Sequence, residues 1–157
     1  MATQWTAGTT SGQVLTAATL NTIGAVWETY TPALTASTTN PNLGTTGSAA
    51  GRYARVNKIV IGNASFTFNG AGINAGLGFY FCSLPITAQN SGAAVGVSNA
   101  IDVSTFASIQ NALILDTTTR VLGIGTGGGA LAGSIQNSTF VWAAGDIIRF
   151  TFCYEAA

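Results

Sequence analysis

Hydrophobic and polar side chains alternate with a period of two along much of the chain. Between residues 59 and 68, Val60 and Phe66 fall on one side of an extended backbone, whereas Asn63 and Ser65 fall on the other. Such alternation is typical of a β-strand with one buried face. The stretch therefore predicts a strand that packs Val60 and Phe66 into a core.

The same pattern returns near the C-terminus, in residues 147–154. Ile148 and Phe150 share one face of this predicted strand, and Arg149 and Cys153 share the other. Further strand-like runs lie at residues 30–37, 51–56, 77–81, 95–103, 112–115 and 120–124, with turns at 57–58, 116–119 and 144–146. Seven or eight short strands predict an all-β fold, an antiparallel β-sandwich or jelly roll.

One short helix is expected ahead of the strands, over residues 17–27. Thr16 can cap its N-terminus, with Leu15 and Leu20 in the two positions of a hydrophobic staple. The apolar residues that follow recur at the spacing of one helical stripe. An isolated helix of about eleven residues is marginally stable, so this one needs a surface to pack on.

We therefore divide the chain into an N-terminal arm with a short helix, residues 1–29, and a β domain, residues 30–157. Two interpretations of the helix stay open: it covers an end of its own β domain, or it docks on a partner. In the second case the N-terminal segment is an anchor. The side chains expected to make that contact are Trp5, Leu15, Leu20, Ile23 and Trp27.

Charge is scarce in this chain. Charged residues make up 6% of the 157 residues, the net charge is zero and there is no His, whereas roughly a quarter of a typical soluble domain is charged. A surface without net charge favours association. Nucleic-acid binding is not expected, because it needs Lys and Arg in excess to neutralise phosphates. A membrane partner is not expected either, because no apolar run approaches about 20 residues.

Catalysis is not expected. Asp116 and Asp146 lie in turn sequences, where Asp bonds to nearby backbone. Without His, a Ser or Cys nucleophile lacks its usual base, and no zinc motif can be completed. The Gly-rich run at 122–129 lacks the Lys-Ser/Thr of a phosphate loop, so it is expected to connect two strands. We expect no enzyme activity, no metal and no cofactor.

The two cysteines, Cys82 and Cys153, each lie in an aromatic, strand-like run. Neighbouring strands could bring them within disulfide reach. Free Cys is among the most buried residue types, so two buried thiols are expected. The tryptophans Trp5, Trp27 and Trp142 could stack on sugars, but aromatic side chains dominate cores and subunit contacts, and we expect those roles.

Several segments recur here in a characteristic order: WTAG at 5–8, VLTAATLN at 14–21, the stretch 30–58, FCSLPITA at 81–88 and GDIIRFTFCYEAA at 145–157. In this order they resemble accessory virion proteins of tailed bacteriophages, variously called minor tail, head-fibre or head-decoration proteins, especially in phages of actinobacteria. The resemblance covers nearly the whole chain and brings no catalytic motif. It implies a small β domain displayed on the particle as a homotrimer, with the N-terminal segment as its anchor.

The resemblance leads us to expect an accessory structural protein on the exterior of a phage virion. It would be made in the host cytoplasm and would contact the major capsid or tail proteins. No long collagen-like or coiled-coil shaft is present, so an extended fibre is not expected. One alternative is a module that binds host-surface glycan through loops 69–76 and 125–133. A polysaccharide-cleaving enzyme, which would depend on Asp102 or Asp116, is a third class.

Overall fold

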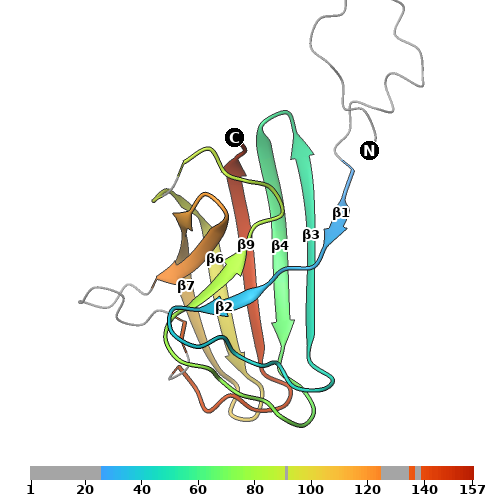
Figure 1. Cartoon of the computed structure of the whole chain (residues 1–157), viewed down its shortest axis with the longest axis vertical. Coiled ribbons are helices and arrows are strands. Elements are labelled where there is room, and N and C mark those ends of the chain that lie inside the picture. Colours follow the sequence, from blue (N-terminus) through green and yellow to red (C-terminus); the bar gives the residue numbers. More distant parts are fainter. Residues whose placement is uncertain (1–25, 91, 125–134, 137–138) are drawn as a thin grey trace, which may run out of the picture.

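The computed structural model describes residues 26–90, 92–124, 135–136 and 139–157, and these residues form one antiparallel sheet of nine strands (Figure 1). The order across the sheet is β1-β3-β4-β9-β6-β7-β8-β5-β2. The strands are β1 (Glu28–Tyr30), β2 (Leu34–Ala36), β3 (Ser48–Val56), β4 (Ile59–Thr67), β5 (Tyr80–Ser83), β6 (Ala94–Asp102), β7 (Ala107–Thr117), β8 (Arg120–Ile124) and β9 (Ile147–Glu155).

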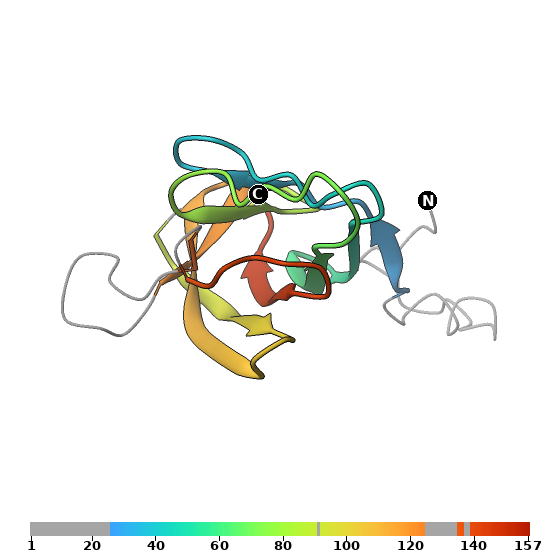
Figure 2. The same cartoon turned by 90° about the horizontal axis from the view of Figure 1, so that it is seen from below.

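The sheet curls so far that its two edges come close together. Strands β1 and β2 lie at opposite ends of the strand order, yet only residues 31–33 separate them in the chain. Four Cα-to-Cα steps span at most about 15 Å, so the edges must approach one another. Figure 2 shows the strands wrapped around an interior. Pro32 is buried in the short link, which suits a residue that cannot donate to a sheet ladder.

The core lies inside the curl and is built from alternate residues of the strands. On β4, every second residue from Val60 to Phe66 is buried, as is every second residue of β9 from Ile148 to Tyr154. The rings of Phe66 and Phe150 meet edge to face, with centroids 6.0 Å apart. Burial of each such large side chain contributes about 1.5–3 kcal/mol. Because these side chains recur at every second position, the face that carries them turns inward.

The prediction of an all-β, antiparallel fold is confirmed. The described strands make one curled sheet, which does not confirm the finer expectation of a sandwich or jelly roll. The predicted run at 30–37 is divided into β1 and β2 around Pro32. The predicted strand at 77–81 begins only at Tyr80, because Leu77 and Phe79 make isolated bridges to Thr39 and Gln136 instead.

The predicted helix falls mostly outside the described residues. Of residues 17–27, the structure describes Val26 and Trp27, which lead into β1 without helical structure. Four of the five expected anchor residues, Trp5, Leu15, Leu20 and Ile23, also lie outside the described residues. Within the described part of the chain, no helix is long and apolar enough to cross a bilayer.

Candidate interaction surface

A contiguous set of apolar side chains lies on the outer face of the sheet, over strands β3, β4, β9 and β6. Val56, Ile59 and Ile61 are 50%, 52% and 47% exposed. Val97 is 59% exposed, and Cys153 is exposed as well. We call these five residues the outer-face patch. Contiguous exposed apolar surface, unlike single exposed side chains, marks interaction sites.

Strand register makes the patch continuous. Val56 is paired with Ile59 at the β3–β4 hairpin, and Ile61 is paired with Cys153 across β4 and β9. Val97 of β6 lies opposite Thr151, two residues before Cys153 on the same face of β9. Paired side chains on one face of a sheet lie about 4.5–5.5 Å apart and diagonal neighbours about 7–8 Å, so Val56, Ile59, Ile61 and Cys153 adjoin one another, while Val97 lies diagonally across from Cys153.

A tight hairpin fixes which residues point outward. Asn57, at the β3–β4 turn, has φ 55°, a left-handed conformation that Asn tolerates. Inside the sheet, Gly62 leaves room for a neighbouring ring: a Cβ there would lie 2.6 Å from Phe152 Cε2. A shift of the β3–β4 register by one residue would turn Ile61 inward and Phe66 outward. Exposing Phe66 would lose its burial in the core, so this register is strongly disfavoured.

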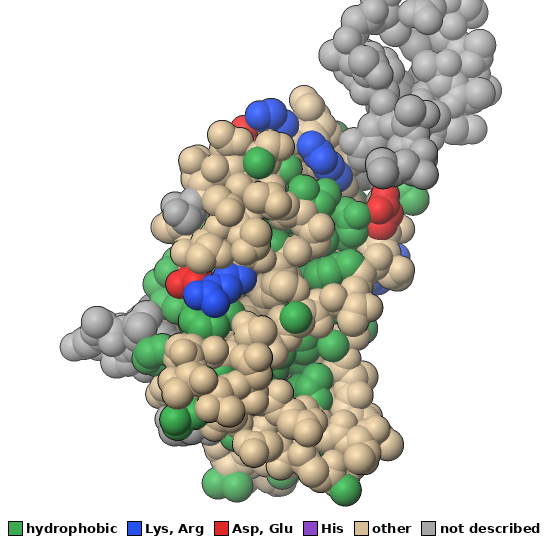
Figure 3. All heavy atoms as spheres, viewed as in Figure 1, with side chains coloured by type: hydrophobic (Ala, Val, Ile, Leu, Met, Phe, Trp, Pro, Cys, Tyr) green, Lys and Arg blue, Asp and Glu red, His purple; other side chains and the backbone are tan. Residues whose placement is uncertain are grey.

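Charges border the patch without entering it. At the hairpin end, Lys58 Nζ lies 4.0 Å from Glu155 Oε1, and both side chains are more than half exposed. Such an exposed pair contributes about 0–1 kcal/mol. Arg149 is exposed on β9 at the other end of this face. On the opposite side of the sheet, where β2 lies in front, Figure 3 shows a few separate charged side chains among the described residues.

Trp27 is the one predicted anchor residue that the structure describes. It is 46% exposed, and the guanidinium of Arg52 lies 5.4 Å from its ring centroid. A cation–π contact at an exposed site is worth about 0.5–1 kcal/mol, so Arg52 holds the ring at the β3 edge without covering it. Trp142, by contrast, is buried against Phe68 and Tyr80, which places it in the core.

Cys153 departs from the prediction of two buried thiols. Cys82 is fully buried on β5, and burial raises the pKa of its thiol to about 12. Cys153 is exposed because it shares the outer face of β9 with Arg149 and Thr151. Both cysteines are free.

Cys153 and Glu155 also border a hollow of about 250 Å³ whose other walls include Gln89, Asn90, Val95 and Leu115.

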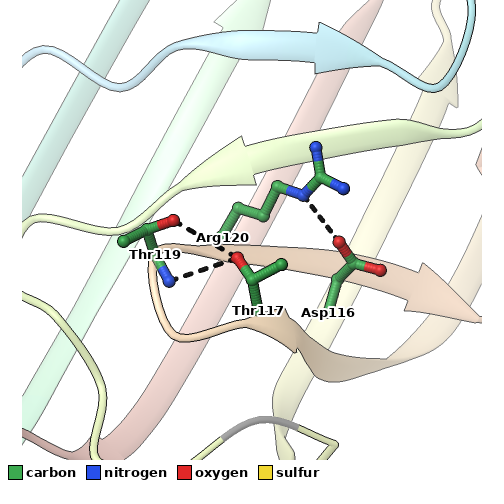
Figure 4. Close-up of polar contacts among 4 residues, drawn as sticks. All are labelled: Asp116, Thr117, Thr119 and Arg120. Carbon is green, nitrogen blue, oxygen red and sulfur yellow. Dashed lines mark hydrogen bonds and ion pairs between the residues drawn. The ribbon is translucent and has the colours of Figure 1, made fainter.

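The carboxylates considered for catalysis are engaged in structural bonds. Asp116 Oδ2 accepts a 2.6 Å bond from Arg120 Nε, beside the contact between the Thr117 and Thr119 hydroxyls (Figure 4). The Arg120 guanidinium also lies 4.0 Å from the ring centroid of Phe81. The carboxylate therefore serves the β7–β8 hairpin through the Arg120 side chain, whereas the turn sequence predicted a bond to nearby backbone.

Asp102 and Asp146 organise the opposite end of the sheet. Asp102 Oδ1 accepts bonds from the Ser104 hydroxyl at 2.7 Å and from the backbone of Ser104 and Thr105, and the Ser104 hydroxyl in particular lowers the pKa of this carboxyl. Asp146 is fully buried, and its two oxygens accept from the backbone N–H groups of Val103 and Ala143. The bond to Val103, 43 residues away, could not be read from turn chemistry.

The loop at 69–76, one of two expected to recognise glycan, is bonded to itself and to residues 42–46. Asn69 Oδ1 accepts from Gly70 N–H, and Asn74 Oδ1 accepts from Gly76 N–H. The backbone of Asn74 pairs with that of Asn42. The loop has no aromatic residue on which a sugar could stack. The whole of the second loop, 125–133, lies outside the described residues.

Sequence reasoning missed Phe106, at the tip of the β6–β7 hairpin. Its ring is 86% exposed and its backbone has φ 57°, an unusual conformation for an aromatic residue. The available signal was an aromatic residue within a polar turn. The sequence signal for the outer-face patch was clearer, since Ile59, Val60 and Ile61 place apolar side chains on both faces of one strand.

Comparison with known proteins adds no relative: no family model, no curated protein and no solved structure matches the chain.

Proposed function

We propose that this chain is an accessory structural protein of a phage virion, displayed on the particle exterior as a capsid-decoration, head-fibre or minor tail protein. It acts as a homotrimer held on the capsid or tail proteins by residues 1–29. The observation that carries the proposal is the outer-face patch, a contiguous apolar surface on a protein with almost no charge. The order of the sequence segments described above supports the choice of a virion.

The patch supports a structural role because of its chemistry. Val56, Ile59 and Ile61 offer area to another protein but no group that could move a proton or hold a metal. The carboxylates Asp102, Asp116 and Asp146 are bonded within the fold. Burying apolar area contributes about 25 cal/mol per Å² before association costs are subtracted. Adhesion to another protein therefore requires apolar area and no catalytic or metal-binding group.

The position of the N-terminal segment supports its role as anchor. It joins the domain at β1, the edge strand beside β3. Trp27 lies there half-exposed and in contact with Arg52. An apolar ring at the root of the segment can continue a contact made by residues further toward the N-terminus.

The sandwich form remains part of the proposal. It is supported by contacts across the interior between strands that are far apart in the sheet order. The Tyr154 hydroxyl of β9 donates to Ile86 O, just after β5, at 2.7 Å. Tyr80 and Cys82 of β5 share one core with Phe150 of β9.

The test is incorporation into particles. Full-length chain and a chain of residues 28–157, which keeps β1 whole and lacks all five anchor side chains, are each supplied to particles assembled without the protein. We expect the full chain to sediment with the particles and the shortened chain to fold but stay in the supernatant. Equal binding of both chains would remove the anchor assignment, and no binding of the full chain would remove the virion role.

Glycan recognition is the weaker alternative, because the Asn side chains of loop 69–76 are already bonded to the backbone. Retention of the isolated protein on host cell walls, competed by soluble wall polysaccharide, would favour it over the structural role.

A further inference from the structure

We propose that residues 28–36 form a strap that opens and closes as one unit while the rest of the sheet stays folded, and that the side chain of Tyr30 holds it closed. The strap comprises β1, the link 31–33 and β2, and it joins the two ends of the strand order. Figure 1 shows it passing in front of β4. This inference goes beyond the proposed function and holds whether or not the chain belongs to a virion.

The strap has few backbone pairs to hold it closed. β1 pairs with β3 at three positions and β2 pairs with β5 at three, whereas β3 and β4 pair at nine. The link bonds to one further residue: Ala33 N–H donates to Ser83 Oγ at 2.8 Å, and Ala33 O accepts from Ser83 N–H at 3.0 Å. Segments with few bonds and contacts open locally at a lower free energy than core strands do. The strap can therefore detach while the nine-residue strands stay paired.

Tyr30 is the aromatic residue of the strap, and its ring occupies a recess on β3. The side chain packs against the core, and its ring meets that of Tyr53 edge to face, with centroids 5.9 Å apart. Gly51 leaves the space for this ring, because a Cβ on Gly51 would collide with Tyr30 Cε1. The three atoms nearest to that Cβ all belong to the Tyr30 ring. Closing the strap therefore seats the ring over Gly51 and buries it.

The hydroxyl of Tyr30 opposes closure. It is buried with no hydrogen-bond partner among the described residues. Burial raises the pKa of this phenol, and the nearby thiol of Cys82 is a smaller cause of the same shift. That thiol is a weak partner, and it is directed at Ser83 O, 3.4 Å away. An unpaired buried hydroxyl costs free energy that water restores when the strap opens, and the cost is similar in size to the gain from burying the ring. Tyr30 therefore holds the strap only weakly.

Hydrogen exchange read by mass spectrometry tests the strap as a unit. Below the unfolding transition in urea, the hydrogen-bonded amides of residues 28–36 should exchange at a rate that urea hardly changes, because opening the strap exposes little surface. The amides of β4 and β9 should exchange more slowly and with a steep dependence on urea, because they open only when the whole chain unfolds. Phe66→Leu, in the core, should speed the exchange of β4 and β9 and leave that of the strap unchanged.

Substitutions at two positions test Tyr30 as the side chain that holds the strap. Tyr30→Phe removes the unpaired hydroxyl and should slow the exchange of the strap by about 5-fold or more. Gly51→Ala fills the recess under the ring and should speed that exchange by about 5-fold or more. In a chain that already carries Tyr30→Ala, Gly51→Ala should have no further effect, because the ring that it displaces is gone. Thermal unfolding establishes that each variant is folded.

Two results would overturn the proposal. Equal urea dependence of exchange in the strap, β4 and β9, or an equal effect of Phe66→Leu on all three, would mean that the strap opens only with the whole chain. A strap that opens separately but exchanges at an unchanged rate in Tyr30→Phe and in Gly51→Ala would remove the role of Tyr30. These assays contain no particles, so their failure leaves the particle-binding test of the proposed function standing.

Discussion

The buried carboxylate of Asp146 offers a quantitative test of how the end of the sheet is held together. Its Oδ1 accepts from Val103 N–H at 3.1 Å and its Oδ2 from Ala143 N–H at 2.8 Å. These bonds tie the β6–β7 turn to the turn that precedes β9. The Asp146 side chain is fully buried, and Asp146→Ala leaves both N–H groups without that partner.

The expected magnitude follows from the two lost bonds. Each N–H left unpaired away from water costs about 1–3 kcal/mol, so the loss of both bonds in Asp146→Ala should lower the free energy of unfolding by about 2–6 kcal/mol, toward the lower end because both bonds are partly buried. Asp146→Asn keeps one acceptor and places an NH₂ group against the other N–H, so it should cost less than the Ala variant but remain clearly destabilising. The remaining backbone bonds of residue 146, to Phe68 and Ala143, are unaffected by the change.

The assay is equilibrium unfolding in urea, with Asp116→Ala as the control. Asp116 pairs with Arg120 at 2.6 Å, but both side chains are partly exposed, so its loss should cost only about 0–1 kcal/mol. Asp146→Ala and Asp116→Ala with equal effects would refute the reasoning. So would an Asp146→Ala variant within about 0.5 kcal/mol of the unmodified chain, because it would mean that water or other groups satisfy the two N–H groups at no cost.

Three further predictions concern Phe106, the thiols and pH. Phe106→Asn should raise the free energy of unfolding by about 0.5–1 kcal/mol, because Asn tolerates the left-handed backbone at φ 57° and the 86% exposed ring gives up little packing. A loss of stability in thermal unfolding would show that the ring packs on something; Val141→Asn, at a site 91% exposed, is the control. Titration of the folded protein with a thiol reagent should give one fast thiol, Cys153, and a second only after denaturation, and two fast thiols would contradict the burial of Cys82. The lowered pKa of Asp102 means that its carboxylate stabilises the fold above about pH 4 and that this is lost as the pH falls further. The stability difference between Asp102→Asn and the unmodified chain should therefore shrink from pH 6 to pH 3, and a constant difference would contradict it.

Much of the strand pattern could be predicted because period-two alternation records which face is buried. The inward residues of β4 and β9, such as Phe66 and Phe150, lie where the alternation placed them. The β3–β4 turn at Asn57 and the turn after Asp116 also lie where turn residues indicated. These features depend on neighbours in the chain, and local sequence carries that information.

Features that depend on distant contacts could not be predicted. The meeting of β1 and β2 follows from the curl of the whole sheet, and the Val103 bond to Asp146 joins segments 43 residues apart. The exposure of Cys153 was a different kind of miss. The alternation of Cys153 with Phe152 and Tyr154 places it on the outer face, and the general tendency of Cys to be buried does not override that local pattern.

The outer-face patch could have been found from the sequence in part. Ile59 and Ile61 are apolar at outward positions of a strand, which is a sign of a covered surface. Their neighbours Val97 and Cys153 come from strands far away in the chain, and only the pairing of β4 with β9 and of β9 with β6 brings them together. The outer-face patch therefore forms only when these strands pair in the folded sheet, and no single segment of the sequence predicts all of it.

The most direct test of the virion role is the composition of purified particles. Particles of the phage that the proposed function implies would be banded by density, stripped of loosely bound protein with salt, and analysed by quantitative mass spectrometry. The account predicts that the chain is present at a fixed ratio to the major capsid protein or to a tail protein, in copies divisible by three. Its absence from such particles, with abundant protein in the lysate, would contradict the account.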